Sequence, residues 1–173
     1  MINRIAIVGG NGSGKTTLGA ALSKELNCKH MDIENYYFED AEIPYSKSRS
    51  RKEVLLLMEQ DVMNYPNFII SAVNADLGEK INSLYECVIY LQVPLDTRLN
   101  RVKQRAIDKF GDRVLVGGDM YEQEQGFFDF VVNKTMEKTD EWAKCLSCPI
   151  IYVDGTNPID ETIGLLLKQL EDL

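Results

Sequence analysis

A lysine and two threonines close a glycine-rich stretch near the start of the chain, GGNGSGKTT, which follows the short apolar run 5–8. Glycines let a backbone approach a polyphosphate so closely that several N–H groups point at its oxygens. A lysine amine can then bridge two phosphates, a threonine hydroxyl can bind Mg²⁺, and a helix that starts there presents its positive end. The spacing GxxxxGK[ST] therefore predicts a site for a nucleoside triphosphate with Mg²⁺. The residues predicted to form it are Gly9, Asn11, Gly12, Ser13, Gly14, Lys15, Thr16 and Thr17.

Two carboxylates, Asp32 and Glu34, lie two residues apart where a second apolar run ends. At the end of a strand, side chains with this spacing point the same way, toward the carboxyl edge at which open sheets bind ligands. Such a pair can serve a metal ion or take a proton from a hydroxyl acceptor. The alternative is a capping or solvated pair.

Three arginines in the stretch PLDTRLNRVKQR, namely Arg98, Arg101 and Arg105, are spaced i, i+3 and i+7. On a helix this spacing gives a cationic face beside an apolar stripe. Planar guanidinium groups complement the charge that phosphoryl transfer spreads over oxygen atoms. Solvated arginines on an amphipathic helix are the alternative.

The elements that must position these groups alternate along the chain. Short apolar runs occur at residues 5–8, 28–32, 68–72, 87–93 and 150–154, with helical patterns between them. This alternation predicts an α/β fold in which a parallel sheet is covered by helices on both faces. The last helix is expected to be capped by Asn157, with Pro158 in its first turn. Residues 34–50 and 107–120 lack a sustained period, so they are expected to extend beyond the sheet.

The size and charge of the chain exclude several classes of protein. Its 173 residues, 45% of them hydrophobic, indicate a single domain over residues 1–173. The net charge of −8 argues against nucleic acid as a partner. No apolar run is long enough for a membrane span or a signal-peptide core. Without an even cysteine framework, reduced thiols and a cytoplasmic protein are expected.

Beyond the glycine-rich loop, the motifs MDIENYY, LQVPLDTRLNRVKQR and VDGTNP give the chain a resemblance to the small P-loop kinases. This group includes adenylate and other nucleoside monophosphate kinases, shikimate kinase and gluconate kinase. The chain also resembles bacterial ATP-binding proteins that carry only a generic ATPase label. The resemblance implies a three-layer fold with a five-stranded parallel sheet in the order 2-3-1-4-5. It also implies an acceptor-binding segment at residues 34–65 and a short lid at residues 107–120.

The same resemblance implies roles for residues around the nucleotide. Arg101 is placed where the family stacks an arginine on adenine, and Gly155 and Thr156 are placed beside that base. Arg105 and the lid's Arg113 are placed where arginines hold the transferring group, so both are predicted to be catalytic together with Lys15.

The metal and the acceptor are less clearly assigned. Thr16 and Asp32 are the predicted Mg²⁺ residues, with Asp32 also counted as catalytic, and Glu34 is expected to meet the acceptor. The third strand carries Ser71 where many P-loop proteins have a magnesium-associated aspartate, which shifts that role to Asp32 and leaves Asp76 a weaker candidate.

A cationic run, SKSRSRK, offers Arg49 and Arg51 as ligands for an anionic acceptor, although solvated surface is the ordinary interpretation of such a run. His30, the only histidine, is given no chemistry. Trp142 and three phenylalanines, Phe127, Phe128 and Phe130, are expected to pack in the core.

The predicted function is ATP-dependent transfer of a phosphoryl group to a small-molecule acceptor, with a nucleoside monophosphate as the leading class. A shikimate- or gluconate-type metabolite kinase and a regulatory ATPase or nucleotide switch are the alternatives. A guanine switch is disfavoured because NKTM replaces the base-reading NKxD pattern. Ring-forming ATPases need a further helical domain for which the chain is too short. The oligomeric state stays open.

Overall fold

Five strands form one sheet in which every neighbouring pair is parallel, in the order β2-β3-β1-β4-β5. The computed structural model describes residues 2–38 and 47–173. The strands are β1 (Arg4–Val8), β2 (Lys29–Asp32), β3 (Phe68–Ala72), β4 (Cys87–Gln92) and β5 (Ile150–Asp154). The observed order confirms the predicted order 2-3-1-4-5.

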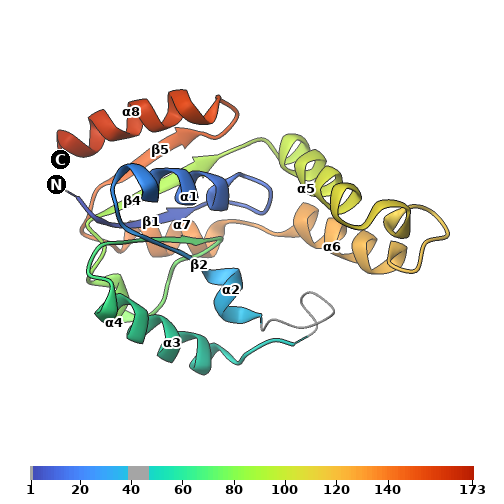
Figure 1. Cartoon of the computed structure of the whole chain (residues 1–173), viewed down its shortest axis with the longest axis horizontal. Helices are drawn as coiled ribbons and strands as arrows, with labels where there is room; N and C mark the ends of the chain where they lie inside the picture. The colour runs from blue at the N-terminus through green and yellow to red at the C-terminus, as the bar shows by residue number, and fades with distance from the viewer. Residues whose placement is uncertain (1, 39–46) are drawn as a thin grey trace.

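The sheet is buried at its centre because helices cover both faces (Figure 1). On one face lie α1 (Lys15–Glu25) and α8 (Ile159–Glu171), and on the other lie α3 (Arg51–Asn64), α4 (Glu79–Asn82) and α7 (Glu137–Lys144). Residues 5–8 of β1 and all of β3 are buried, which explains why these strands are continuously apolar rather than alternating.

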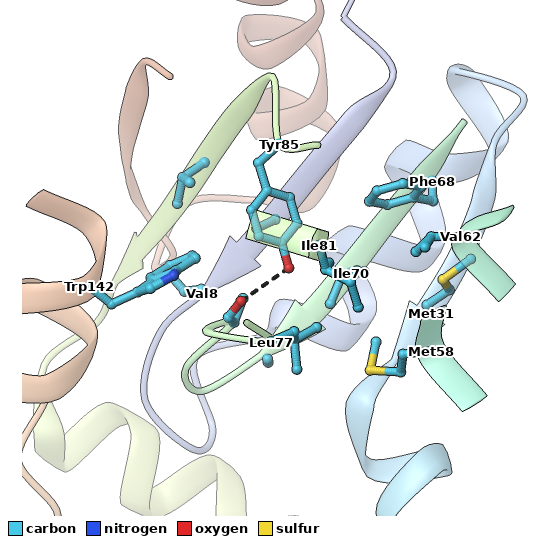
Figure 2. Close-up of a cluster of buried hydrophobic side chains, with 14 of the residues drawn as sticks. Val8, Met31, Met58, Val62, Phe68, Ile70, Leu77, Ile81, Tyr85 and Trp142 are labelled. Atoms are coloured by element: carbon cyan, nitrogen blue, oxygen red, sulfur yellow. Dashed lines mark hydrogen bonds between the residues drawn. The ribbon is translucent and has the colours of Figure 1, made fainter. Parts of the chain in front are cut away.

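The core on the second face joins side chains from several elements (Figure 2). Met58 and Val62 of α3 pack against β3, and Tyr85 meets Phe68 and Trp142 edge to face. The buried Tyr85 hydroxyl donates a hydrogen bond of 3.1 Å to the carbonyl of Ala75. Trp142 is therefore a core residue, as predicted.

Helix ends show how local sequence sets the boundaries. A reciprocal capping box between Ser50 and Glu53 starts α3. The expected cap of α8 at Asn157 is wrong, because Pro158 occupies the cap position and no side chain caps this helix. Proline needs no N–H partner there, so the fixed backbone angle of Pro158 starts the helix without a side-chain acceptor.

A second group of helices extends from the sheet at the right of Figure 1. It consists of α5 (Leu95–Phe110), the 3₁₀ turn η1 (Gly111–Val114) and α6 (Tyr121–Asn133). A small core of Val102, Ala106, Val114 and Phe128 holds these helices together. Residues 107–110 of the expected lid belong to α5, so within that segment only η1 and residues 115–120 lie outside a long helix.

The expected acceptor-binding segment, residues 34–65, contains most of the short helix α2 (Ile33–Tyr37) and all of α3. A β-bridge between Phe38 and Ser48 ties these two parts together. Residues 39–46 of the segment lie outside the described residues. In the described ranges, no helix has the length and apolar character that crossing a bilayer requires.

Candidate active site

The loop between β1 and α1 gathers unpartnered amides at the start of a helix. Gly14 caps α1 with a left-handed backbone (φ 96°), and the first hydrogen bond of the helix runs from Leu18 N to the Gly14 carbonyl (2.9 Å). Within the helix, the N–H groups of residues 14–17 therefore have no backbone acceptor. Together with the helix dipole, these amides form a site that fits the oxygens of a polyphosphate.

Lys15 points back over this loop. Its Nζ donates a 3.0 Å hydrogen bond to the carbonyl of Gly10. Burial lowers the pKa of Lys15 to about 8, and the arginines of α5 add to that effect, whereas the carboxylates of Glu34 and Asp32 oppose it. The Lys15 ammonium group therefore loses its proton at a lower pH than an exposed lysine does.

The lowered pKa of Lys15 predicts how nucleotide affinity depends on pH. A bound polyphosphate favours the charged amine, so binding above pH 8 must take up a proton. The affinity for Mg·ATP should be nearly constant from about pH 7 to 7.5 and fall by up to about tenfold per pH unit above that pKa. Calorimetry in buffers of different ionisation enthalpy measures both quantities. A Lys15→Arg protein, whose cation does not titrate there, should show no such dependence; a dependence that persists would contradict the assignment.

Thr16 and Asp32 meet directly at the end of β2. The Thr16 hydroxyl donates a hydrogen bond to one oxygen of the Asp32 carboxylate (2.6 Å). The other oxygen accepts a hydrogen bond from the backbone N–H of Glu34 (3.0 Å), so Asp32 is the N-cap of α2. A hydroxyl beside a carboxylate is an oxygen donor set that fits Mg²⁺. The Asp76 carboxylate instead accepts a hydrogen bond from the side-chain amide of Asn82 (2.8 Å).

The described residues contain no cluster of three or more aspartate, glutamate, histidine or cysteine side chains that could hold a metal.

Ser71 connects β3 to the start of α1 through its hydroxyl group. It is 1% exposed, its hydroxyl contacts His30 Nε2 (2.9 Å) and donates to the carbonyl of Lys15 (3.2 Å). Ser71 and His30 therefore link β3 and β2 to the first turn of α1. His30, to which no chemistry was assigned, thus has a structural role.

Gly19 of α1 lies directly over this contact, which gives a stability prediction. A methyl group there would come within 2.4 Å of His30 Nε2 and 2.5 Å of Ser71 Oγ. Gly19→Ala should lower the free energy of unfolding by roughly 1–3 kcal/mol, although alanine is the better helix former. Urea titration measures this. The matched control Gly164→Ala in α8, where nothing lies within 4 Å, should gain up to about 1 kcal/mol. Equal effects at both positions would contradict the steric argument.

A cavity of about 620 Å³ opens between the loop, the carboxyl ends of β2 and β3, and helices α2, α5 and α6. It brings together most of the predicted residues. Those that line it are Asn11, Gly12, Gly14, Lys15, Thr16, Thr17, Asp32, Glu34, Arg51, Arg101 and Arg105. Ser71 and Asp76 line it as well.

A smaller cavity of about 230 Å³ adjoins the loop on its other side, next to the start of α8. Ser13, Gly155 and Arg101 line it. The Arg101 guanidinium donates two hydrogen bonds of 3.0 Å to the Gly155 carbonyl and one of 3.4 Å to the Ser13 carbonyl. Thr156 does not line this cavity; its N–H and hydroxyl bind the Asp154 carboxylate.

The three arginines of α5 differ in what they contact. Arg98 donates to the carbonyls of Val93 (3.2 Å) and Asn11 (3.3 Å), so it braces the outside of the loop. Arg101 is engaged at Gly155. Arg105 lines the large cavity and has no hydrogen bond or ion pair with another described residue. Its guanidinium is therefore the one on this helix face that a ligand can engage without competition.

Three predicted cations lie in different settings. Arg113 forms a two-pronged ion pair with Asp119 (3.0 and 2.8 Å), which raises its pKa, and it does not line the cavity. Arg49 donates to backbone carbonyls around the end of α2, at Tyr36 and Phe38. Arg51 lines the cavity and donates to the backbone carbonyl of Asp76 (2.9 Å).

Sequence reasoning missed three cavity residues on and after α6. The prediction that Phe130 is a core residue is wrong, because it is 48% exposed and lines the cavity. Phe128 is buried as predicted, and Phe127 is partly buried against the same small core but also lines the cavity. The rings of Phe127 and Phe130 stack 6.2 Å apart, and Lys134 Nζ lies 4.7 Å from the centroid of Phe130. The spacing i, i+3, i+7 of Phe127, Phe130 and Lys134 was the available signal.

Comparisons with known proteins show the family and the fold of the chain. The sequence model of the AAA domain family matches residues 5–125. The uncharacterised protein YqaC of Bacillus subtilis (strain 168) is 33% identical, with 98% of each chain covered. A shikimate kinase of Sulfurihydrogenibium is 28% identical over 59% of this chain and 68% of its own.

Two solved structures share the fold. The shikimate kinase of Bacteroides thetaiotaomicron is 21% identical, with 99% of each chain covered and a TM-score of 0.64. A deoxyadenosine kinase of M. mycoides with bound dATP is 19% identical, with 97% of this chain and 99% of that chain covered and a TM-score of 0.56. These likenesses show a P-loop kinase fold.

Proposed function

We propose a phosphotransferase function for this chain, which belongs to the AAA domain family and has a P-loop kinase fold. In this proposal the protein transfers the γ-phosphoryl group of Mg·ATP to a small acceptor. A nucleoside monophosphate is the leading acceptor class. The observation that carries the proposal is the convergence of Lys15, the Thr16–Asp32 pair and Arg105 on one large cavity, beside a smaller one that borders the same loop.

Each group has a defined task in this proposal. The loop amides and Lys15 hold the β- and γ-phosphates, and Thr16 and Asp32 hold Mg²⁺, which neutralises phosphate charge when it is bound. Arg105 is placed to stabilise charge on the transferring group. The smaller cavity is proposed to take adenine, with Arg101, Gly155 and the neighbouring Thr156 at its border.

The composition of the large cavity favours an anionic acceptor. Arg51, Arg105 and Lys134 all line it, and an acceptor that already carries negative charge needs positioning and charge neutralisation more than it needs a base. Arg51 and, at the end of α2, Arg49 belong to the proposed acceptor site. Glu34 supports the second candidate, a hydroxylated acid or sugar, because a carboxylate can take a proton from a hydroxyl group.

ADP release tests the proposal. The protein is assayed with Mg·ATP alone, then with nucleoside monophosphates, shikimate and gluconate. Release that depends on one of these acceptors supports phosphotransfer. Release that no acceptor changes would overturn it and would favour a regulatory ATPase, in which the acceptor segment meets another protein.

A further inference from the structure

A further space adjoins the large cavity. Its volume is about 280 Å³, and it lies between α2, α5 and α6, of which α5 and α6 stand side by side in Figure 1. Five residues line both spaces, so the two spaces adjoin. They are Glu34, Phe38, Val102, Arg105 and Phe127. We call the space of about 280 Å³ the side chamber.

The walls of the side chamber are largely apolar. Phe38, Phe110 and Phe127 are its aromatic residues, and Val102 and Ala106 of α5 add aliphatic surface. The other residues that line it carry polar or charged groups, namely Glu34, Arg105, Lys109, Gln123 and Glu124. Hydrogen bonds are therefore open to many acceptors, but an alicyclic hydroxy acid has no flat aromatic face to pack on the phenylalanine rings. A planar ring, in contrast, can pack on the aromatic faces.

The side chamber does not reach the residues that are proposed to hold the phosphates and the metal. Lys15, Thr16 and Asp32 line the large cavity but not the side chamber. Arg105 lines both, at their junction. A molecule that spans the two spaces would therefore place an anionic group near Arg105 and its other end among the phenylalanines.

We infer that the side chamber binds the aromatic ring of the acceptor, with Phe110 and Phe127 as its packing surfaces and Gln123 as a hydrogen-bonding group at the ring edge. This inference rests on the proposed function and names the acceptor class: a ring-bearing monophosphate, not an alicyclic hydroxy acid. Gln123 also lines the side chamber, and its amide can both donate to and accept from a nucleobase.

Calorimetry on the full chain, saturated with Mg²⁺ and a non-hydrolysable ATP analogue, tests the inference. The probes are AMP and CMP, which carry a ring, and ribose 5-phosphate, which has the same sugar and phosphate without one. The ring-bearing probes should bind at least about tenfold more tightly. Phe127→Ala should weaken the tighter of the two by about tenfold and leave ribose 5-phosphate unchanged. Val132→Ala, on the same helix but lining neither space, is the matched control.

A second variant, at an exposed position, separates the loss of a ligand contact from a folding defect. Gln123 is exposed, so Gln123→Ala should fold normally and weaken AMP or CMP severalfold while sparing ribose 5-phosphate. Equal binding of ringed and ringless probes, or an equal loss of both in Phe127→Ala, would overturn the inference. Failure of all three probes to bind would overturn it too.

The ADP-release assay separates this inference from the function on which it rests. If shikimate or gluconate stimulates release and no ring-bearing monophosphate does, phosphotransfer stands and the side chamber has been misassigned. If no acceptor stimulates release, both fail.

Discussion

Lys15→Ala is expected to lower kcat by at least about a hundredfold, the largest loss that we predict for a single substitution. The Lys15 amine lies on the loop carbonyl of Gly10, within the same cavity as Thr16 and Asp32. Its charge is preorganised for the β- and γ-phosphates, and such a group acts most strongly on charge that develops during transfer. The measurement is acceptor-dependent ADP release at saturating Mg·ATP.

The matched control for this substitution is Lys24→Ala, which removes an exposed lysine from the last turn of the same helix. Its kcat should equal that of the unchanged protein, and both variants should unfold at nearly the same temperature as the parent. Near-normal turnover in Lys15→Ala would contradict the mechanism, because nothing else among the described residues places an amine over the loop.

The phosphate end of the site could be predicted because the loop residues that form it follow one another in the sequence. The GxxxxGK[ST] spacing fixes where the turn and the helix dipole lie. Asp32 is the last residue of β2 and Glu34 lies in the first turn of α2, so both stand at the carboxyl edge of the sheet. The sheet order came from the family resemblance. The structure brings Lys15, Thr16 and Asp32 together as this reasoning required.

The acceptor end could not be predicted in the same way, because it depends on how separate helices pack. Phe128 and Phe130 have the same apolar character, yet α6 buries Phe128 and exposes Phe130 to the cavity, while Phe127 borders both the small core and the cavity. Likewise, the spacing of the α5 arginines indicates one face but not which of them bind backbone carbonyls. Only the structure separates Arg105 from Arg98.

Arg113 shows a further limit of sequence reasoning. Its catalytic role is still a prediction, because the guanidinium is paired with Asp119 outside the cavity. For Arg113 to reach the transferring group, that ion pair must open and the segment around η1 must move. Both side chains are exposed, and exposed ion pairs contribute little to stability, so the pair can open readily.

Asp32→Asn is expected to reduce turnover by about 10- to 100-fold and to raise the Mg²⁺ concentration needed for half-maximal activity by a similar factor. Asparagine is as good a helix cap as aspartate, so the contact with the Glu34 amide and the start of α2 should survive. What is lost is the negative charge beside the Thr16 hydroxyl. Turnover is measured as a function of Mg²⁺ concentration, with Asp96→Asn, an exposed first-turn carboxylate outside the cavity, as the control.

A second measurement on Asp32→Asn separates a charge effect from damage to the fold. The Asp32 carboxylate raises the pKa of Lys15 against the effect of burial, so its neutralisation should lower that pKa further. The pH above which Mg·ATP affinity begins to fall should then shift below that of the unchanged protein. A merely structural role for Asp32 would weaken binding equally at every pH. If the pH profile does not move while turnover falls, Asp32 acts on the shape of the site and not through its charge.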